Sequence, residues 1–201
     1  MKKVAKGNFG YIRDQKKRRI IITIIMFSIP LVIYFTGLLQ THTRKNLFTL
    51  VAILGCLPAS KSAVGMILIC LQKPMEKVLY DKILPHVRDL TVIYDTVVSA
   101  YEKNTQLPCI VISGLNVICY CEDTKVNSSF VESHIKKILQ SNGYKANVKI
   151  FTDLNHFLRR VDELYAHREE LEKDVPFTPD ERYPDATRNE LVKAVLLAIS
   201  V

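Results

Sequence analysis

Three residues of this chain could support hydrolysis: Asp95, Asp123 and Lys125. Asp123 and Lys125 have an acidic-x-Lys spacing and follow an apolar run that we expect to be a strand, so both would lie at its end. A carboxylate pair beside a lysine can hold Mg²⁺ and activate a water molecule against a phosphodiester, because Mg²⁺ prefers hard oxygen ligands. These three residues are therefore the candidate catalytic residues.

That chemistry also requires a second acid close to Asp123, because one carboxylate is only half of the ligand pair. The expected strand over residues 108–113 contains none, and Asp95 falls one strand too early. Asp123 and Lys125 can instead belong to a solvated turn before a helix, where Asp123 would favour the helix dipole. We therefore lean towards a chain that is not an enzyme.

Cysteines and histidines do not indicate a metal centre. Cys119 and Cys121 point to one face of a strand, but zinc sites usually pair cysteines at wider spacing and need two further ligands. None of the five histidines repeats at a metal-ligand spacing. Buried cysteines that serve as small core residues are the simpler interpretation, and we expect neither a metal nor a cofactor.

Two apolar runs, residues 20–39 and 47–71, dominate the first part of the chain. The first has 20 residues without a charge, which as a helix spans about 30 Å, the thickness of a bilayer's hydrocarbon core. A cleavable signal peptide would have a shorter apolar region and a small-residue cleavage site, which residues 40–43 do not offer. The first run therefore predicts an uncleaved membrane span.

The second run contains Lys61. A lysine at the centre of a membrane helix costs about 3 kcal/mol, and the twelve large apolar residues of the run return about 4–7 kcal/mol in total. We therefore expect a transmembrane helical hairpin over residues 20–71, and a re-entrant second segment is the alternative.

Lys61 needs an explanation, together with Pro58 three residues earlier. Lysines inside membrane segments commonly face a bundle interior or a cavity, so Lys61 and Pro58 form a candidate intramembrane site. The alternative is structural, because Pro58 leaves the carbonyl of Leu54 without a donor and the Lys61 ammonium could supply one. Small residues nearby favour helix packing on the first span or on a second copy of the chain. They are Gly55, Ala59, Ser62 and Ala63.

Charge divides the chain into two parts. Residues 1–73 contain 12 Lys and Arg against one acid, a charge of +11, whereas residues 74–201 contain 16 against 19 acids, a charge of −3. Residues 1–19 are therefore a basic tail beside the first span. Four of them are the candidates for contact with anionic lipid headgroups: Lys16, Lys17, Arg18 and Arg19.

The same charges predict orientation. Positive flanks stay in the cytoplasm, so we expect both termini there, the short loop outside, and a multi-pass protein of the cell (plasma) membrane. Because a bilayer is a sufficient partner for a basic run beside a span, we do not expect nucleic-acid binding.

Residues 74–201 are long enough for one domain with its own core. Pro74 favours the start of a helix that runs towards Pro85. Residues 90–100 predict a strand, and a continuation of the preceding helix is the alternative because length and periodicity are ambiguous there. The turn formers of residues 113–116 predict a hairpin of two further strands.

The rest of this domain is predicted mostly helical. Ser129 and Glu132 form a capping-box pattern before an amphipathic helix, which is followed by a strand over 148–151. Asp153 is predicted to cap a helix that continues to about residue 174, and a second capping box opens the last helix. The order α-β-β-β-α-β-α-α indicates an α/β fold, a small cytoplasmic α/β sandwich with a mixed sheet.

Helix, three strands, helix, strand is also the core order of the restriction-endonuclease-like nucleases. In that family an Asp lies on the second core strand and an acidic-x-Lys motif on the third. Asp123 and Lys125 match the second motif in position, but the Asp of the second strand is missing. This resemblance implies at most a degenerate site.

As a whole, the chain resembles a group of uncharacterised short two-span membrane proteins of Gram-positive anaerobic bacteria. The resemblance rests on the basic start, on residues 54–61 and on residues 144–151. Such proteins sometimes carry the label O-linked GlcNAc transferase-like. Those transferases resemble long helical-repeat proteins joined to nucleotide-sugar-binding domains, and residues 74–201 have no repeat and too little length for both. The resemblance therefore implies the two-span topology and no activity.

These observations predict a membrane-anchored protein that acts as a non-enzymatic binding or adaptor module. Its expected partners are the lipid bilayer and an unknown cytoplasmic protein or small ligand, with a homo-oligomer through the second span as a further option. The alternative is a small membrane-bound hydrolase with a degenerate restriction-endonuclease-like fold.

Overall fold

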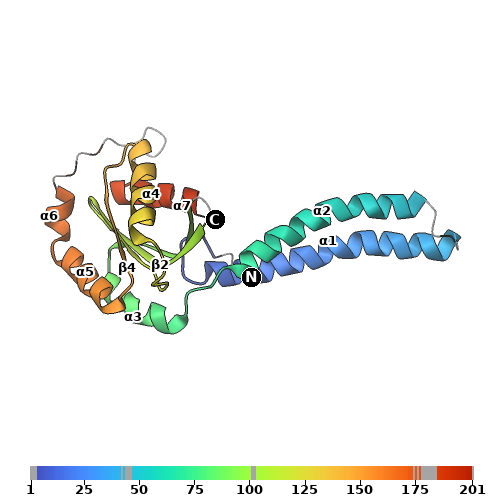
Figure 1. Ribbon diagram of the computed structural model, residues 1–201, viewed down its shortest axis with the longest axis horizontal. Coiled ribbons are helices and arrows are strands. Elements are labelled where there is room, and N and C mark those ends of the chain that lie inside the picture. The colour runs from blue at the N-terminus through green and yellow to red at the C-terminus, as the bar shows by residue number, and fades with distance from the viewer. Residues whose placement is uncertain are drawn as a thin grey trace. The chain divides into compact units, whose positions relative to one another are not determined.

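The structure is a computed structural model. It describes residues 4–200 with the exception of 42, 44–46, 101–102, 174, 176 and 178–184. Across the described residues the chain forms seven helices and one four-stranded mixed sheet (Figure 1). It divides into two compact units: unit 1 comprises Met1–Tyr11 and Pro74–Val201, and unit 2 comprises Ile12–Lys73.

Unit 2 is a pair of long helices, with α1 over Tyr11–Thr41 and α2 over Leu47–Leu71. They run antiparallel: Thr23 Oγ1 lies 3.0 Å from Ser62 Oγ, and Lys16 Nζ donates to the Cys70 carbonyl over 2.9 Å. The numbers of the two residues in each pair add up to 85 or 86, so a residue of α1 lies level with the residue of α2 whose number brings the sum to about 85. Both helices are long and apolar enough to cross a membrane.

The apolar side chains of this hairpin face outwards. Ile24, Val32 and Leu57 keep 60%, 62% and 69% of their surface exposed, whereas Ala52 and Ala59 are buried. Bulky side chains outside and small ones inside reverse the pattern of a helix that packs in a water-soluble core.

Unit 1 contains the sheet, in the order β1-β2-β3-β4. Its strands are β1 Thr91–Ala100, β2 Lys103–Ser113, β3 Asn116–Tyr120 and β4 Asn147–Phe151. The first three are antiparallel neighbours, and β4 runs parallel to β3. The predicted hairpin is therefore confirmed, with its turn at Gly114.

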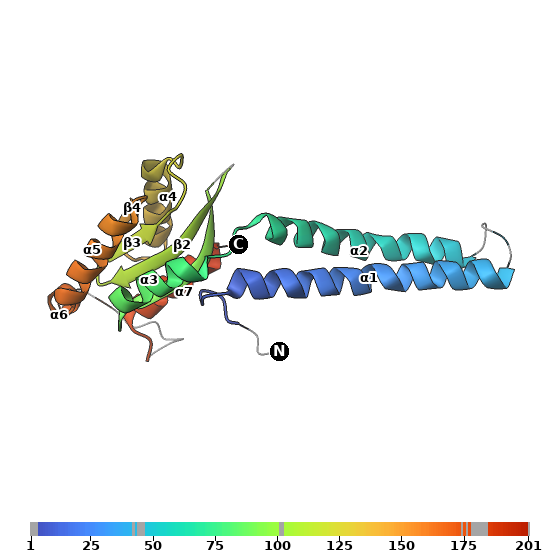
Figure 2. The ribbon, with the colours of Figure 1, turned by 90° about the horizontal axis from the view of Figure 1, so that it is seen from below.

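Helices cover both faces of this sheet (Figure 2). On one face, α4 (Ser128–Ser141) and α7 (Arg188–Ile199) pack through Ile135 and Leu196. On the other face, α3 (Lys77–Val87) and α5 (Leu154–Ala166) pack through Ile83 and Phe157. The predicted α/β sandwich with a mixed sheet is thus what forms in unit 1.

One element differs from the predicted order. The helix that was expected to continue to about residue 174 ends at Ala166, and His167 is its C-cap at φ −105° and ψ 18°. A separate short helix, α6, covers Arg168–Lys173. Two helices therefore replace one, because the chain leaves helical geometry at His167.

The capping prediction for α4 was wrong, and that for α7 was right. Asn127, not Ser129, is the N-cap of α4 and accepts the Phe130 N–H. The Glu132 carboxylate instead accepts the Ile150 N–H over 2.8 Å. At α7, Thr187 and Glu190 form the reciprocal capping box that the sequence predicts.

Strands β1 and β2 change faces together at one pair of residues. Tyr94 of β1 and Cys109 of β2 pack towards α3 and α5, whereas Val98 of β1 and Leu107 of β2 pack towards α4 and α7. Tyr94 and Val98 are four residues apart, and Leu107 and Cys109 are two apart, so regular alternation along a strand would place both members of each pair on the same face. The strand pairing continues on both sides of the change. Asp95 has φ +52°, and the register places it opposite Pro108, which has no N–H to donate. The carboxylate of Asp95 accepts hydrogen bonds from backbone segments outside the sheet at this point.

Residues 4–10 pack on unit 1. Gly7 O accepts the Tyr94 N–H over 2.7 Å, and the Phe9 ring stacks on Tyr80 at 4.1 Å. The segment predicted as a basic tail over residues 1–19 is therefore divided in the structure. Its first part lies against the sheet domain, and its second part belongs to α1, which begins at Tyr11.

Candidate functional site

Asp95, one of the candidate catalytic acids, is 6% exposed and fully engaged by backbone donors. Its Oδ2 accepts the Gly10 N–H over 2.7 Å, and its Oδ1 accepts the Met75 N–H over 2.6 Å. Hydrogen bonds to a carboxylate are shorter and stronger than those between neutral groups. Asp95 therefore works as a clamp between two backbone segments.

The two clamped segments are the connections to the long helices. Gly10 immediately precedes α1, and Met75 comes four residues after the end of α2. The aromatic contacts of Phe9 with Tyr80, and of Tyr80 with Tyr94 at 5.1 Å, fix the same region of unit 1. Both points at which the chain leaves the sheet domain are thus tied to strand β1.

Asp123 and Lys125 lie in the turn between β3 and α4. The Asp123 Oδ1 accepts the Lys125 N–H over 2.9 Å, and both residues are exposed. No acid lies on β2, and the described part of the chain brings no group of three metal-ligating residues together. The three candidate catalytic residues therefore have separate local roles: two are in a turn and one is a clamp.

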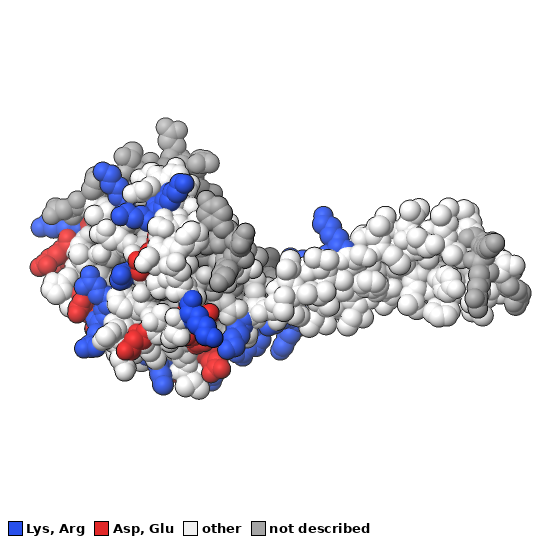
Figure 3. Space-filling view, in the orientation of Figure 1, with Lys and Arg blue, Asp and Glu red and all other residues white. Residues whose placement is uncertain are grey.

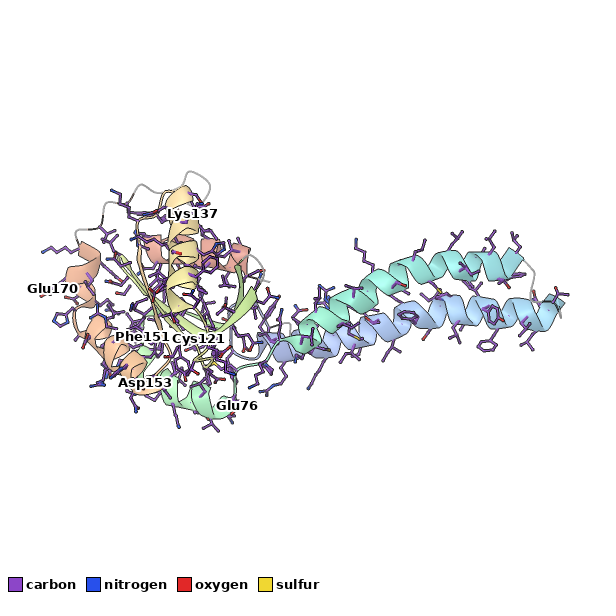
Figure 4. The ribbon with its side chains drawn as sticks, viewed as in Figure 1. Glu76, Cys121, Lys137, Phe151, Asp153 and Glu170 are labelled. Atoms are coloured by element: carbon purple, nitrogen blue, oxygen red, sulfur yellow. The ribbon has the colours of Figure 1, made fainter. Side chains whose placement is uncertain are left out.

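The three cysteines of unit 1 are core residues. Cys109 packs towards α3 and α5, and Cys119 and Cys121 pack towards α4 and α7. Cys121 lies beside Phe151, where its N–H donates to the Phe151 carbonyl over 2.9 Å (Figure 4). Burial raises the pKa of all three thiols, so they are protonated and poorly nucleophilic at neutral pH.

A hollow of about 340 Å³ lies where the β2–β3 turn, α6 and the start of α7 meet. Arg188 donates to the carbonyls of Gly114 and Lys145, and burial lowers its pKa. The Glu172 carboxylate accepts from Asn189 Nδ2 over 2.8 Å. The lining residues are Gly114, Glu172, Val175, Phe177, Thr187, Arg188 and Asn189.

This hollow combines opposite charges with an apolar wall. Its volume lies within the range of small-molecule sites, and Arg188 and Glu172 could orient a ligand that carries polar groups. Sequence reasoning missed both residues, because they lie on different helices 16 positions apart without a motif. Only the packing of α7 beside the β2–β3 turn brings them together.

In unit 2 the small residues of α2 face α1. A side chain on Gly55 would come within 3.2 Å of Pro30, Ala59 is fully buried, and Ser62 meets Thr23. Ala63 is half-buried. Gly55, Ala59 and Ser62 are thus occupied within the hairpin.

Lys61 and Pro58 are both exposed on α2. Pro58 lies inside one continuous helix. Within the described residues the Lys61 ammonium makes no hydrogen bond, so the bond to the Leu54 carbonyl that the structural alternative allows is not formed.

The basic residues near the start of α1 do not all behave alike. Lys16 donates to the Cys70 carbonyl, and the Arg19 guanidinium lies next to Gly65. Lys17 and Arg18 are exposed. Figure 3 shows charged side chains of both signs scattered over the visible face of unit 1, whereas the visible surface of the hairpin is largely uncharged.

Comparisons of the chain with protein-family models, with curated proteins and with solved structures found no match.

Proposed function

We propose that this chain is a two-span membrane protein whose hairpin anchors a cytoplasmic α/β domain, which serves as a non-enzymatic binding or adaptor module. The observation that carries the proposal is the outward orientation of the large apolar side chains of α1 and α2. In water such a surface would be strongly unfavourable, and in a bilayer it is the expected solvent-facing surface.

The distribution of charge supports the orientation. Lys16 to Arg19 precede the uncharged part of α1, and Lys73 follows α2, whereas the loop between the helices holds two basic residues. Lys and Arg remain on the cytoplasmic side during insertion, so both termini would face the cytoplasm of a cell bounded by this plasma membrane.

The Asp95 clamp supports an anchored module. A domain whose two chain connections are both tied to one strand of its sheet has these connections at one defined part of its own surface. The hollow beside Arg188 and Glu172 is the binding site that we assign to a small polar ligand of this module.

Alkaline carbonate extraction of membranes that contain the full chain tests the anchor. We expect the protein to stay in the membrane pellet, because two spans resist removal of peripheral contacts. Release into the supernatant together with a peripheral marker protein would contradict the proposal.

Purification in mild detergent, with mass spectrometry of bound small molecules, tests the hollow. Glu172→Gln keeps an acceptor but removes the charge, and we expect it to reduce a co-purifying ligand about tenfold, as for loss of one charge-assisted hydrogen bond. Glu170→Gln, on the same helix and exposed, is the control (Figure 4). Equal recovery of the ligand from both variants would contradict the proposal that the hollow is its binding site.

A further inference from the structure

Arg19 and Lys61 lie on the same flank of helix α2. The Nη1 atom of Arg19 is 3.2 Å from the point that a Cβ of Gly65 would occupy, so the guanidinium lies across this glycine. Lys61 precedes Gly65 by four residues, and residues at this spacing are neighbours on a helix surface. The two cations therefore border one strip of the hairpin surface.

The register of the two helices gives the depth of Lys61. Because facing residue numbers add up to about 85, Lys61 is level with Ile24, five residues along α1 from Arg19. Five residues of helix span about 7.5 Å. Arg19 is the last charged residue before the uncharged run over residues 20–39, so Lys61 is level with the first quarter of that run, although it lies near the middle of α2 itself. A lysine at this depth can extend its ammonium to the interface.

The acid of the hairpin, Asp14 in the first turn of α1, forms no ion pair with either cation among the described residues. Residues 15–75 contain no Asp or Glu. Within the described residues neither Arg19 nor Lys61 forms an ion pair or a hydrogen bond. Two cations beside an apolar surface require an anion from the surroundings.

We propose that Arg19 and Lys61 form a binding site for the phosphodiester group of an anionic phospholipid in the cytoplasmic leaflet. The inference rests on the proposed membrane insertion. Arg19 supplies a planar fork of donors that matches phosphate oxygens, and Lys61 supplies a second charge on a flexible stem. Gly65 leaves the space in which the guanidinium lies.

The test uses the full chain reconstituted in vesicles of phosphatidylcholine and phosphatidylglycerol in equal parts. After extraction in mild detergent, native mass spectrometry counts the lipids that stay bound to each protein molecule. We expect wild-type protein to retain phosphatidylglycerol in preference to phosphatidylcholine.

Four variants locate the site. Lys61→Leu and Arg19→Gln should each lower retention of phosphatidylglycerol about fivefold, the factor expected for one basic residue at an anionic surface. Lys61→Arg should retain it. Lys137→Leu is the control, because Lys137 is an exposed cation on α4, outside the hairpin. It should change retention less than about twofold.

The outcomes separate this inference from the proposed function. If the protein inserts but Lys61→Leu behaves like Lys137→Leu, the lipid site is wrong and the anchor stands. If the protein does not enter vesicles, both fail. If inorganic phosphate displaces phosphatidylglycerol at equal concentration, the site is a general anion site and the lipid assignment is overturned.

Discussion

Asp95 shows how one side chain can hold a domain to its chain connections. The residue sits at φ +52° in the middle of an apolar strand, and its two carboxylate oxygens receive the N–H groups of Gly10 and Met75. A buried acid in a strand is costly unless it is bonded. Here the bonds come from segments that lie 85 and 20 positions away in the chain.

Replacing Asp95 by Asn should therefore destabilise unit 1. Asn tolerates the positive φ but offers one acceptor where the carboxylate offers two, so one buried N–H loses its partner. We expect a loss of about 1–3 kcal/mol in the free energy of unfolding, measured by circular dichroism in mild detergent. Asp81→Asn, at an exposed position of α3, should change it by less than about 0.5 kcal/mol. Equal effects of the two variants would contradict the clamp.

Gly114 and Gly143 form a matched pair for a second measurement. Both have positive φ, but a Cβ on Gly114 would lie 2.3 Å from the Leu171 carbonyl oxygen, whereas nothing lies within 4 Å of one on Gly143. Gly143→Ala should cost about 1 kcal/mol from backbone strain alone. Gly114→Ala should cost at least about 2 kcal/mol more, because α6 must shift. Similar unfolding midpoints for the two variants would show that α6 does not pack against this turn.

At the residue scale the sequence indicated which side chains carry chemistry but not what they contact. The pattern around Asp123 and Lys125 allowed a metal site or a solvated turn, with the turn favoured, and the structure places both residues in a turn. Asp95 stood out as an acid in an apolar strand, yet its donors come from distant parts of the chain that no local pattern reveals. Arg188 and Glu172 carry no motif, and only tertiary packing joins them at one hollow.

Strand β4 is an edge of the sheet, and helix α4 protects it. The backbone groups of odd-numbered β4 residues point towards β3: Asn147 N–H donates to the Leu115 carbonyl, and the Phe151 carbonyl accepts the Cys121 N–H. Backbone groups of even-numbered residues point the other way, so the Ile150 N–H faces the free edge of the sheet. Glu132 accepts this N–H, and Lys149 lies 3.5 Å from the same carboxylate. An open strand edge favours pairing with another chain.

Glu132→Leu should therefore expose a donor at the sheet edge. We expect aggregation of the full chain to start at a lower protein concentration, as measured by light scattering in mild detergent. Glu132→Gln is the control, because it retains an acceptor for Ile150 and should behave nearly as wild type. If both variants aggregate alike, the negative charge and not the hydrogen bond protects the edge.

The N-cap of α4 provides a test at the helix start. Asn127→Ala should lower the free energy of unfolding by about 1 kcal/mol, because the Phe130 N–H loses its acceptor. Ser129→Ala should have little effect, since Ser129 lies inside the helix. Thermal unfolding of the two variants shows which residue caps the helix. A greater loss of stability for Ser129→Ala than for Asn127→Ala would instead support Ser129 as the N-cap, as the sequence predicted.

Most elements of unit 1 follow from local sequence patterns, and their exceptions have local causes. Apolar spacing and turn residues predict the helices, the hairpin and the strand after Gly143. The Ser-x-x-Glu pattern at residues 129–132 was misleading, because Asn127 two positions earlier caps the helix and Glu132 serves the sheet. The face change at Asp95 and Pro108 requires two strands at once, so no single strand pattern predicts it.

At the scale of the whole molecule, two features determine the proposed role. Unit 2 presents large apolar side chains outwards, and unit 1 binds the backbone at both of its connections to that hairpin. The apolar runs and the division of charge follow from the sequence. That residues 4–10 pack on the sheet domain does not, because a short basic segment carries no pattern for it.

Labelling of introduced cysteines with a membrane-impermeant maleimide tests the central claim most directly. In a background with Cys56 and Cys70 replaced by Ala, the remaining cysteines are buried in unit 1. One variant places a cysteine in the loop (Thr43→Cys), and the other places it on the outer side of α4 (Lys137→Cys; Figure 4). We expect Thr43→Cys to react in intact cells and Lys137→Cys to react only after lysis. Reaction of Lys137→Cys in intact cells would contradict a membrane hairpin with a cytoplasmic domain.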